Sequence, residues 1–383
     1  MTCDKRLAVA AAAAVLLAAS LVSSLPARRA AAQPRGKTEE DLRLSLTAPA
    51  KASGWGLVLR SGAWALPPRY AYIAPFREGF ARVYQNGKWG IISRDGVIVW
   101  EPRFSDLDDF HEGLAAAREE EGYGFVDGRG EWSVEPAWDG AWGFSEGRAR
   151  VRKGRKMGFI DTNGLLRVPL RYDYAGHFSG GRSRVRLSRR WGFIDREGRA
   201  VILPSMEAAD DFSEGLAGVR LGGRWGFVGP DGKWAVAPRF EAASLFSEGL
   251  AAVREGSRWG YLSRSGGLAV SPRFVSAGDF RGGRAMAALK GGKWGFVNSR
   301  GAWVVDPEFD ALRPFSEGRA AARKGGKWGF IDSGGGWRVE PGYEMVLPFS
   351  GGLAPARLDG KWGYVDPEGA TVIRHVYADA WGF

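Results

Sequence analysis

The sequence predicts an all-β protein made of ten tandem repeats of about 34 residues, each a three-stranded antiparallel unit stacked face to face on the next. Three observations predict this fold class. A Trp-Gly pair returns at a fixed period, a turn signal follows each pair at a constant distance, and a Pro-x-aromatic element follows the turn. Because the period is conserved from end to end, one long array describes the chain better than several domains.

The Trp-Gly pair marks the strand around which each unit is built. The second residue after the Trp is Leu, Ile, Phe or Tyr and the third is aliphatic, as in Trp225-Gly226-Phe227-Val228. Side chains alternate along a strand, so both faces are apolar and both must be covered. We therefore expect the Trp residues to belong to the core. They are Trp55, Trp89, Trp191, Trp225, Trp259, Trp294, Trp328 and Trp362, and positions 123 and 157 carry Tyr and Met instead.

The flanking strands are defined by turn chemistry. A strand such as Leu250–Arg254 leads through a Gly-bearing hairpin into the Trp-Gly strand, and the one extra residue of the array falls in such a hairpin, between Arg284 and Trp294. After the Trp-Gly strand, sequences such as Asp-Arg-Glu-Gly198 predict a type I turn. The next strand contains Pro, for example Pro238, which predicts an edge strand because Pro donates no ladder hydrogen bond.

Gly226 and its equivalents suggest a close approach inside the array, because Gly weakens a strand unless something occupies the space. We hypothesise that the missing side chain leaves a hollow for an aromatic ring of the adjacent unit.

Residues with catalytic or metal-binding chemistry recur only where the repeat explains them. Asp at the first turn position is expected to accept backbone N–H bonds rather than bind calcium, and Glu before the connector Gly, as at Glu112 and Glu248, is expected to tie loops. The histidines His111, His177 and His375 have no metal-ligand spacing and are expected to occupy substituted surface or connector positions. We predict no catalytic residue, no metal site and no cofactor.

The segment Lys361-Trp-Gly-Tyr-Val-Asp-Pro-Glu-Gly369 resembles the bacterial WG repeat, also called the KWG repeat. The resemblance covers residues 46–383 in ten copies, with departures at Tyr123, Met157 and the strand ahead of Trp55. It implies a bacterial β-repeat array and brings no known set of catalytic residues.

Closure of the array is a separate question. The chain ends at Phe383, where a further unit would begin, so no spare strand is expected to complete a sheet at the other end. Ten three-stranded units would also leave a wide centre compared with propellers of four to eight blades. An open, curved or superhelical stack is therefore expected in preference to a closed propeller-like ring.

The N-terminus has the layout of a secretory signal peptide over residues 1–32: basic residues, an apolar run over 7–25 and a small-residue site before Gln33. The alternative is an uncleaved anchor helix, since the run is about long enough to span a membrane. Residues 33–45 are polar and are interpreted as a tether. Cys3 is the one cysteine, so a chain cleaved after residue 32 has no thiol chemistry.

Charge is the one sequence feature that suggests a ligand-binding role in addition to a structural one. The chain carries +11, and a basic residue directly precedes the Trp-Gly position in eight units. Stacking should align these residues into basic rows that face an anionic ligand, although they could instead be a solubilising face whose Arg stems cover the neighbouring rings. They are Lys88, Lys156, Arg190, Arg224, Arg258, Lys293, Lys327 and Lys361.

Together these features predict an exported, non-enzymatic scaffold that is periplasmic, extracellular or at the cell surface. We expect it to bind envelope components, meaning anionic glycan, cell wall or an envelope protein, by repeated weak contacts. The alternative is a polysaccharide-acting enzyme or enzyme subunit. Nucleic acid fits the charge but not the export signal, and membrane contact is expected only through residues 7–25 if they are retained.

Overall fold

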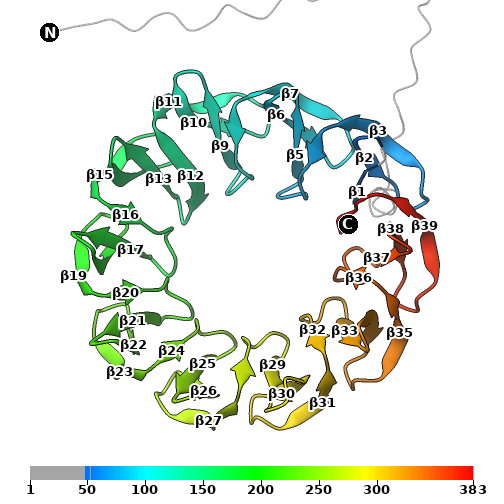
Figure 1. Ribbon diagram of the computed structural model, residues 1–383. Coiled ribbons are helices and arrows are strands. Elements are labelled where there is room, and N and C mark those ends of the chain that lie inside the picture. Colours follow the sequence, from blue (N-terminus) through cyan, green and yellow to red (C-terminus); the bar gives the residue numbers. More distant parts are fainter. Residues whose placement is uncertain (1–47, 52, 383) are drawn as a thin grey trace, which may run out of the picture. The chain divides into compact units, whose positions relative to one another are not determined.

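The computed structural model describes residues 48–51 and 53–382, which lie in one compact unit spanning 39–383. Over these residues the protein forms nine four-stranded antiparallel sheets and one three-stranded sheet. Figure 1 shows the sheets as blades around a central opening. The all-β class is confirmed, and the fold is a propeller-like ring. The predicted signal peptide (1–32) and tether (33–45) lie outside the described residues.

The predicted Trp-Gly strand is the third strand of each four-stranded sheet and the second of the three-stranded one, so it is central as expected. The second residue after the Trp packs against the following sheet and the third against the preceding one. Phe227 and Val228, for example, are fully buried in two different clusters. These strands are β2 (Trp55–Val58), β6 (Lys88–Ser93), β10 (Gly122–Asp127), β14 (Lys156–Ile160), β18 (Arg190–Asp195), β22 (Arg224–Val228), β26 (Arg258–Ser263), β30 (Trp294–Asn298), β34 (Lys327–Ile331) and β38 (Lys361–Val365).

The strand before it forms the predicted hairpin with it. The extra residue of the array lies in the loop between β29 and β30, as the sequence indicates. These second strands are β1 (Ala48–Lys51), β5 (Phe80–Gln85), β9 (Leu114–Glu119), β13 (Arg148–Lys153), β17 (Arg182–Leu187), β21 (Ala217–Leu221), β25 (Leu250–Glu255), β29 (Arg284–Ala288), β33 (Ala320–Lys324) and β37 (Ala354–Leu358).

The Pro-bearing strand is the outer edge of every sheet, which confirms that prediction. Its Pro lies where no ladder N–H is needed, and the last outer strand has His375 at that position. These strands are β3 (Trp64–Tyr70), β7 (Ile98–Phe104), β11 (Trp132–Trp138), β15 (Leu166–Tyr172), β19 (Ala200–Met206), β23 (Trp234–Phe240), β27 (Leu268–Phe274), β31 (Trp303–Phe309), β35 (Trp337–Tyr343) and β39 (Thr371–Tyr377).

The prediction of three-stranded units is wrong, because the connector contains a further inner strand that pairs with the next repeat. Most of these strands have two residues, too few for any alternation to be visible in the sequence. They are β4 (Tyr72–Ile73), β8 (Asp106–Leu107), β12 (Gly140–Ser145), β16 (Tyr174–Ala175), β20 (Ala208–Ala209), β24 (Ala242–Ala243), β28 (Ser276–Ala277), β32 (Ala311–Leu312) and β36 (Met345–Val346).

The prediction of an open array is also wrong. The described residues form ten hydrophobic clusters, and each lies between two neighbouring sheets. One of them joins the two ends: Val58 of the first sheet packs with Trp362, Tyr364 and Ile373 of the last. A ring of ten sheets with ten such interfaces has no free sheet face.

The C-terminal segment supports the closure. Ala380 forms a β-bridge at the position of the second inner-strand residue of the other sheets, and Trp381 stacks on Trp55 with ring centroids 6.3 Å apart. The first sheet, β1–β2–β3, is the one without an inner strand of its own. The prediction that no residues remain to complete the first sheet is wrong, because an inner strand can be as short as the segment around Ala380.

The glycine of the Trp-Gly pair has a different role from the one hypothesised. The outer strand bulges opposite it, since Trp225 pairs with Phe240 but Phe227 with Val236. A Cβ on Gly226 would lie 2.5 Å from the Val236 carbonyl oxygen and 2.7 Å from the Pro238 nitrogen. The space is filled by the backbone of the same sheet and not by an aromatic ring of the adjacent unit.

Candidate functional site

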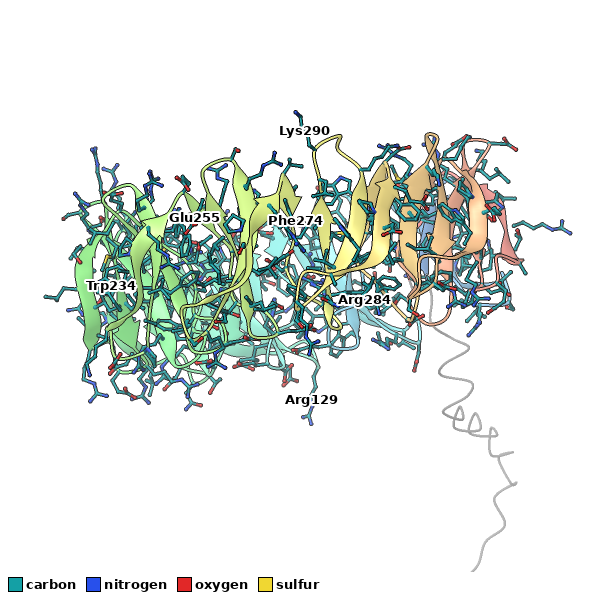
Figure 2. The ribbon with its side chains drawn as sticks, turned by 90° about the horizontal axis from the view of Figure 1, so that it is seen from below. Arg129, Trp234, Glu255, Phe274, Arg284 and Lys290 are labelled. Atoms are coloured by element: carbon teal, nitrogen blue, oxygen red, sulfur yellow. The ribbon has the colours of Figure 1, made fainter. Side chains whose placement is uncertain are left out.

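The hairpins between the second and third strands all lie on one face of the ring, because every sheet repeats the same antiparallel order from inside to outside. We call this the hairpin face, and the opposite one, which carries the turns between the third and outer strands, the turn face. Figure 2 shows Lys290, in the β29–β30 hairpin, and Arg129, in the β10–β11 turn, at opposite faces.

Positive charge is concentrated in the hairpins. They contain 20 Lys and Arg against five Asp and Glu, a net charge of +15, whereas the whole chain carries +11. The hairpin segments counted are 83–88, 117–122, 151–156, 185–190, 219–224, 253–258, 287–293, 322–327 and 356–361. The rest of the chain is therefore slightly acidic, and part of that acidity lies on the same face, in carboxylates between the outer and inner strands that contact the hairpins.

The eight predicted basic residues lie one to a hairpin, at or just before the start of the Trp-Gly strand, and are exposed or half-buried. The structure brings them to one face but spreads them around the ring, so they do not form a single pocket. Five have no acidic partner within ion-pair distance among the residues that the structure describes: Lys88, Arg190, Arg258, Lys327 and Lys361.

The other three are neutralised by the residue just after the outer strand of the same sheet. Lys156 lies 2.6 Å from Asp173, Arg224 pairs with Glu241, and Lys293 pairs with Asp310. In each pair the hydrogen bond from the basic side chain is the main cause that lowers the pKa of the carboxyl. These three positions offer less charge to a ligand than the sequence suggests.

A second row of arginines, five residues before the Trp position, covers aromatic rings. Arg118, Arg186, Arg254 and Arg323 lie over Tyr123, Trp191, Trp259 and Trp328 at 5.6–5.8 Å from the ring centroids. Covering a ring was the alternative to ligand binding for the basic rows, and for these arginines it accounts for their position. Trp191, Trp225 and Trp259 are half-buried, while Trp55, Trp328 and Trp362 are buried.

The hairpin loops are held by carboxylates. Glu207 accepts hydrogen bonds from the N–H groups of Gly222 and Gly223 at 3.1 and 3.0 Å, and Glu241 accepts one from Gly256 at 2.9 Å. Each carboxylate lies between the outer strand of one sheet and the inner strand of the next. A ligand on this face therefore meets loops that are already ordered.

Two hollows of about 360 and 370 Å³ flank Lys88, which lines both. The first is bordered by Glu119, Glu120 and Glu121, the one acidic hairpin of the face. Farther along, the β13–β14, β17–β18 and β21–β22 hairpins contain nine basic residues and no acidic one. Four of the nine, Lys153, Lys156, Arg220 and Arg224, pair with carboxylates of the adjacent connectors.

The recurring acids of the turn face have structural roles, as predicted. Asp195 Oδ1 accepts hydrogen bonds from the N–H groups of Glu197 and Arg199 within its turn. Glu248 accepts them from Gly282 and Gly283 of the next repeat, at 2.6 and 2.8 Å. No group of three or more potential metal-binding residues occurs among the described residues.

Sequence reasoning missed the residues at the inner rim. His111 and His177 were expected at surface or connector positions and Trp142 was not singled out, yet the three line one hollow of about 340 Å³. The signal that could have found the histidines is their departure from the repeat: His177 stands directly before the connector Phe, where other repeats have Asp, Pro, Leu or Gly, and His111 directly after it, where most have Ser. His375, by contrast, lies beside Tyr343 on the outer strand, with ring centroids 6.0 Å apart.

Within the described part of the chain, no helix has the length and apolar character needed to cross a membrane.

Solved structures similar to this chain have low sequence identity to it. A eukaryotic initiation factor has a TM-score of 0.50 at 11% identity, with 87% of this chain and 97% of that chain covered. BamB from Moraxella catarrhalis has a TM-score of 0.34 at 11% identity, covering 73% of this chain and 93% of that one. The likeness to the initiation factor concerns the fold alone. No curated protein matches the sequence.

The WG containing repeat matches ten successive segments, which span most of the chain. They are 55–89, 89–122, 123–156, 157–188, 191–225, 225–259, 259–294, 294–328, 328–362 and 362–383. These are the units whose Trp-Gly strands form the middle of each sheet. The chain belongs to the WG-repeat family.

Proposed function

We propose that the protein is an exported, non-enzymatic scaffold whose hairpin face binds anionic envelope material such as an acidic glycan or cell wall. The observation that carries the proposal is the net charge of +15 in the hairpins of one face, against +11 for the whole chain. An extended anion crossing several hairpins would make many weak contacts at once, and their combined strength would exceed that of any single one.

The geometry favours an extended ligand over a small one on this face. The five basic residues without an acidic partner among the described residues are spread around the ring, one to a hairpin. Long-range attraction between this face and a polyanion would be electrostatic and would weaken as salt screens it, because the Debye length falls from about 14 to 6 Å between about 50 and 300 mM salt.

The test is co-sedimentation of the purified protein with insoluble bacterial cell wall at about 50 and 300 mM salt. We expect binding at the lower salt that weakens at least about tenfold at the higher one, and no comparable binding to an insoluble neutral glycan such as cellulose. Absence of binding at both salt concentrations, or equal binding to cellulose, would retire the anionic-wall proposal and point to a protein partner.

A further inference from the structure

The inner rim of the ring is where the repeats differ most in chemistry. In the sheet β12–β15, Ala141 pairs with Val151 and Phe144 with Ala149, so Trp142 and Gly143 lie together opposite Arg150. The inner strand thus bulges, with two residues against one. Figure 1 shows β12 on the side of the central opening. The corresponding positions carry Asp, His and Arg in nearby repeats and Ala, Leu, Pro or Ser in several others.

Two other sheets also carry Arg opposite this bulge, and there a carboxylate of the next sheet neutralises it. Arg82 Nε lies 2.7 Å from Asp109 Oδ1, and Arg184 Nε lies 3.1 Å from Asp211 Oδ1. Both aspartates occupy the second bulge position of the following sheet. Each pair joins neighbouring sheets at the rim, and each arginine also donates to a backbone carbonyl there.

Arg150 has no such carboxylate, because the second bulge position of the following sheet is His177. Its guanidinium lies over the Trp142 ring at 5.1 Å and donates to the Ala175 carbonyl at 3.0 Å, while its buried Nε has no hydrogen-bond partner among the described residues. The unpartnered Nε alone does not distinguish it, since Arg254 and Arg323 share this feature. What distinguishes Arg150 is an open hollow beside it together with the absence of a paired carboxylate, since Arg82 also borders a hollow but pairs with Asp109.

That hollow has a volume of about 340 Å³ and is lined by polar and aromatic side chains, among them Asp108, His111, Trp142, Ser145, Arg150 and His177. Its size suits one small ligand. A Cβ on Gly143 would collide with the His111 ring, so the absence of a side chain at 143 is what lets His111 lie along the wall. Trp142 and Asp108 also border a neighbouring hollow of about 330 Å³.

We propose that this pocket binds a uronic acid unit, with the ligand carboxylate on Arg150 in the place that Asp109 and Asp211 take beside the equivalent arginines. A guanidinium fork matches a carboxylate in geometry and charge. The exposed part of the Trp142 ring packs against the apolar face of the sugar. Asp108 accepts hydrogen bonds from the sugar hydroxyls. The site is separate from the hairpin face, so it stands or falls independently of the proposed function.

The experiment is titration of the whole protein with glucuronate, followed by isothermal calorimetry and by saturation-transfer NMR of the sugar protons. His177→Asp restores the carboxylate found in the two neighbouring arginine sites, and Arg150→Gln removes the fork. Both variants should weaken binding at least about tenfold, the cost of losing one charge-assisted interaction. Arg82→Gln is the matched control, because Arg82 is already neutralised by Asp109, and it should bind as the unaltered protein does.

Neutral glucose should bind at least about tenfold more weakly than glucuronate. Thermal unfolding of each variant shows whether it is folded, and since His177 is exposed, its substitution should leave the fold intact. The proposal is overturned by the absence of glucuronate binding to the unaltered protein at tens of millimolar, by equal affinity for glucose, or by a folded His177→Asp variant that binds glucuronate undiminished.

Discussion

Gly226 illustrates why the Trp-Gly pair has a glycine at its second position. The bulge around Pro238 in the outer strand brings the Val236 carbonyl toward the strand beside it, and only a residue without a side chain leaves room. The same close approach occurs at Gly90, Gly192 and Gly260. The glycine therefore accompanies the bulge of the outer strand, including in the last repeat, where Gly363 faces a bulge that contains His375 in place of Pro.

We expect Gly226→Ala to destabilise the protein by about 2 kcal/mol, because the added Cβ meets backbone atoms that cannot turn away. The measurement is the urea midpoint of unfolding. Gly342→Ala is the control: its Cβ would find its nearest atom at 3.9 Å, and a change below about 0.5 kcal/mol is expected. Equal midpoints for the two variants would show that the close approach carries no energy.

Between elements, two series of hydrogen bonds connect each connector to the next along the turn face. Glu248 accepts from the backbone of Gly282 and Gly283, and Ser247 Oγ donates to the Phe280 carbonyl at 2.7 Å. Similar bonds recur at 33- to 35-residue separations around the ring, for instance from Ser213 to Phe246. Hydrophobic packing joins the sheets, and these bonds fix their loops.

Glu248→Ala should remove two charge-assisted hydrogen bonds and speed amide exchange at Gly282 and Gly283, with a loss of stability of about 1 kcal/mol. Hydrogen–deuterium exchange followed by mass spectrometry locates the effect. In Glu214→Ala the faster exchange should move to Gly249, the group that Glu214 contacts. Unchanged exchange at 282–283 would mean that the loop is ordered without the glutamate.

Much of each repeat could be predicted from the sequence because its signals are local. The Trp-Gly period placed the central strand, Pro238 and its equivalents the edge strand, and Asp195 and its equivalents the turn. The inner strand could not be predicted, since two residues such as Ala242–Ala243 show no alternation and pair with the following repeat.

The candidate surface was predicted in outline and altered in detail. The sequence located the basic residues on the hairpins, but their partners depend on packing. The pairing of Arg224 with Glu241 depends on a residue outside the hairpin loop. The packing of Arg254 over Trp259 depends on the orientation of the ring. The Arg150 site was missed because its meaning appears only when each arginine is compared with the residue facing it from the next sheet.

For the whole molecule, closure is the property that local signals leave open. Every sheet would pack on its neighbours in much the same way in a spiral or in a ring, and only the contact between the ends distinguishes the two. That contact consists of the cluster around Val58 and Tyr364, the stacking of Trp381 on Trp55, and the edge-on contact of Trp64 with Tyr377.

Trp381→Ala should loosen the closure and lower the exchange protection of the first sheet, residues 55–70, more than that of any other. A loss of about 2 kcal/mol is expected for a half-buried Trp. Trp234→Ala is the matched control, because Trp234 is 41% exposed on an outer strand away from the closure. If both variants lose protection evenly around the ring, closure does not depend on the C-terminal segment.

The ring also gives the charges their arrangement, since it gathers the hairpins on one face and the turns on the other. The most direct measurement is the affinity for cell wall at about 50 mM salt of two triple variants with the same change in net charge. One carries Glu at Arg155, Arg189 and Lys290, all exposed on the hairpin face, and the other carries Glu at Arg94, Arg129 and Arg300, all exposed on the turn face.

The hairpin variant should lose at least about tenfold in affinity, and the turn variant should stay within about twofold of the unaltered protein. That result would assign binding to the hairpin face. Equal losses would show that the wall responds only to net charge and would contradict a binding face.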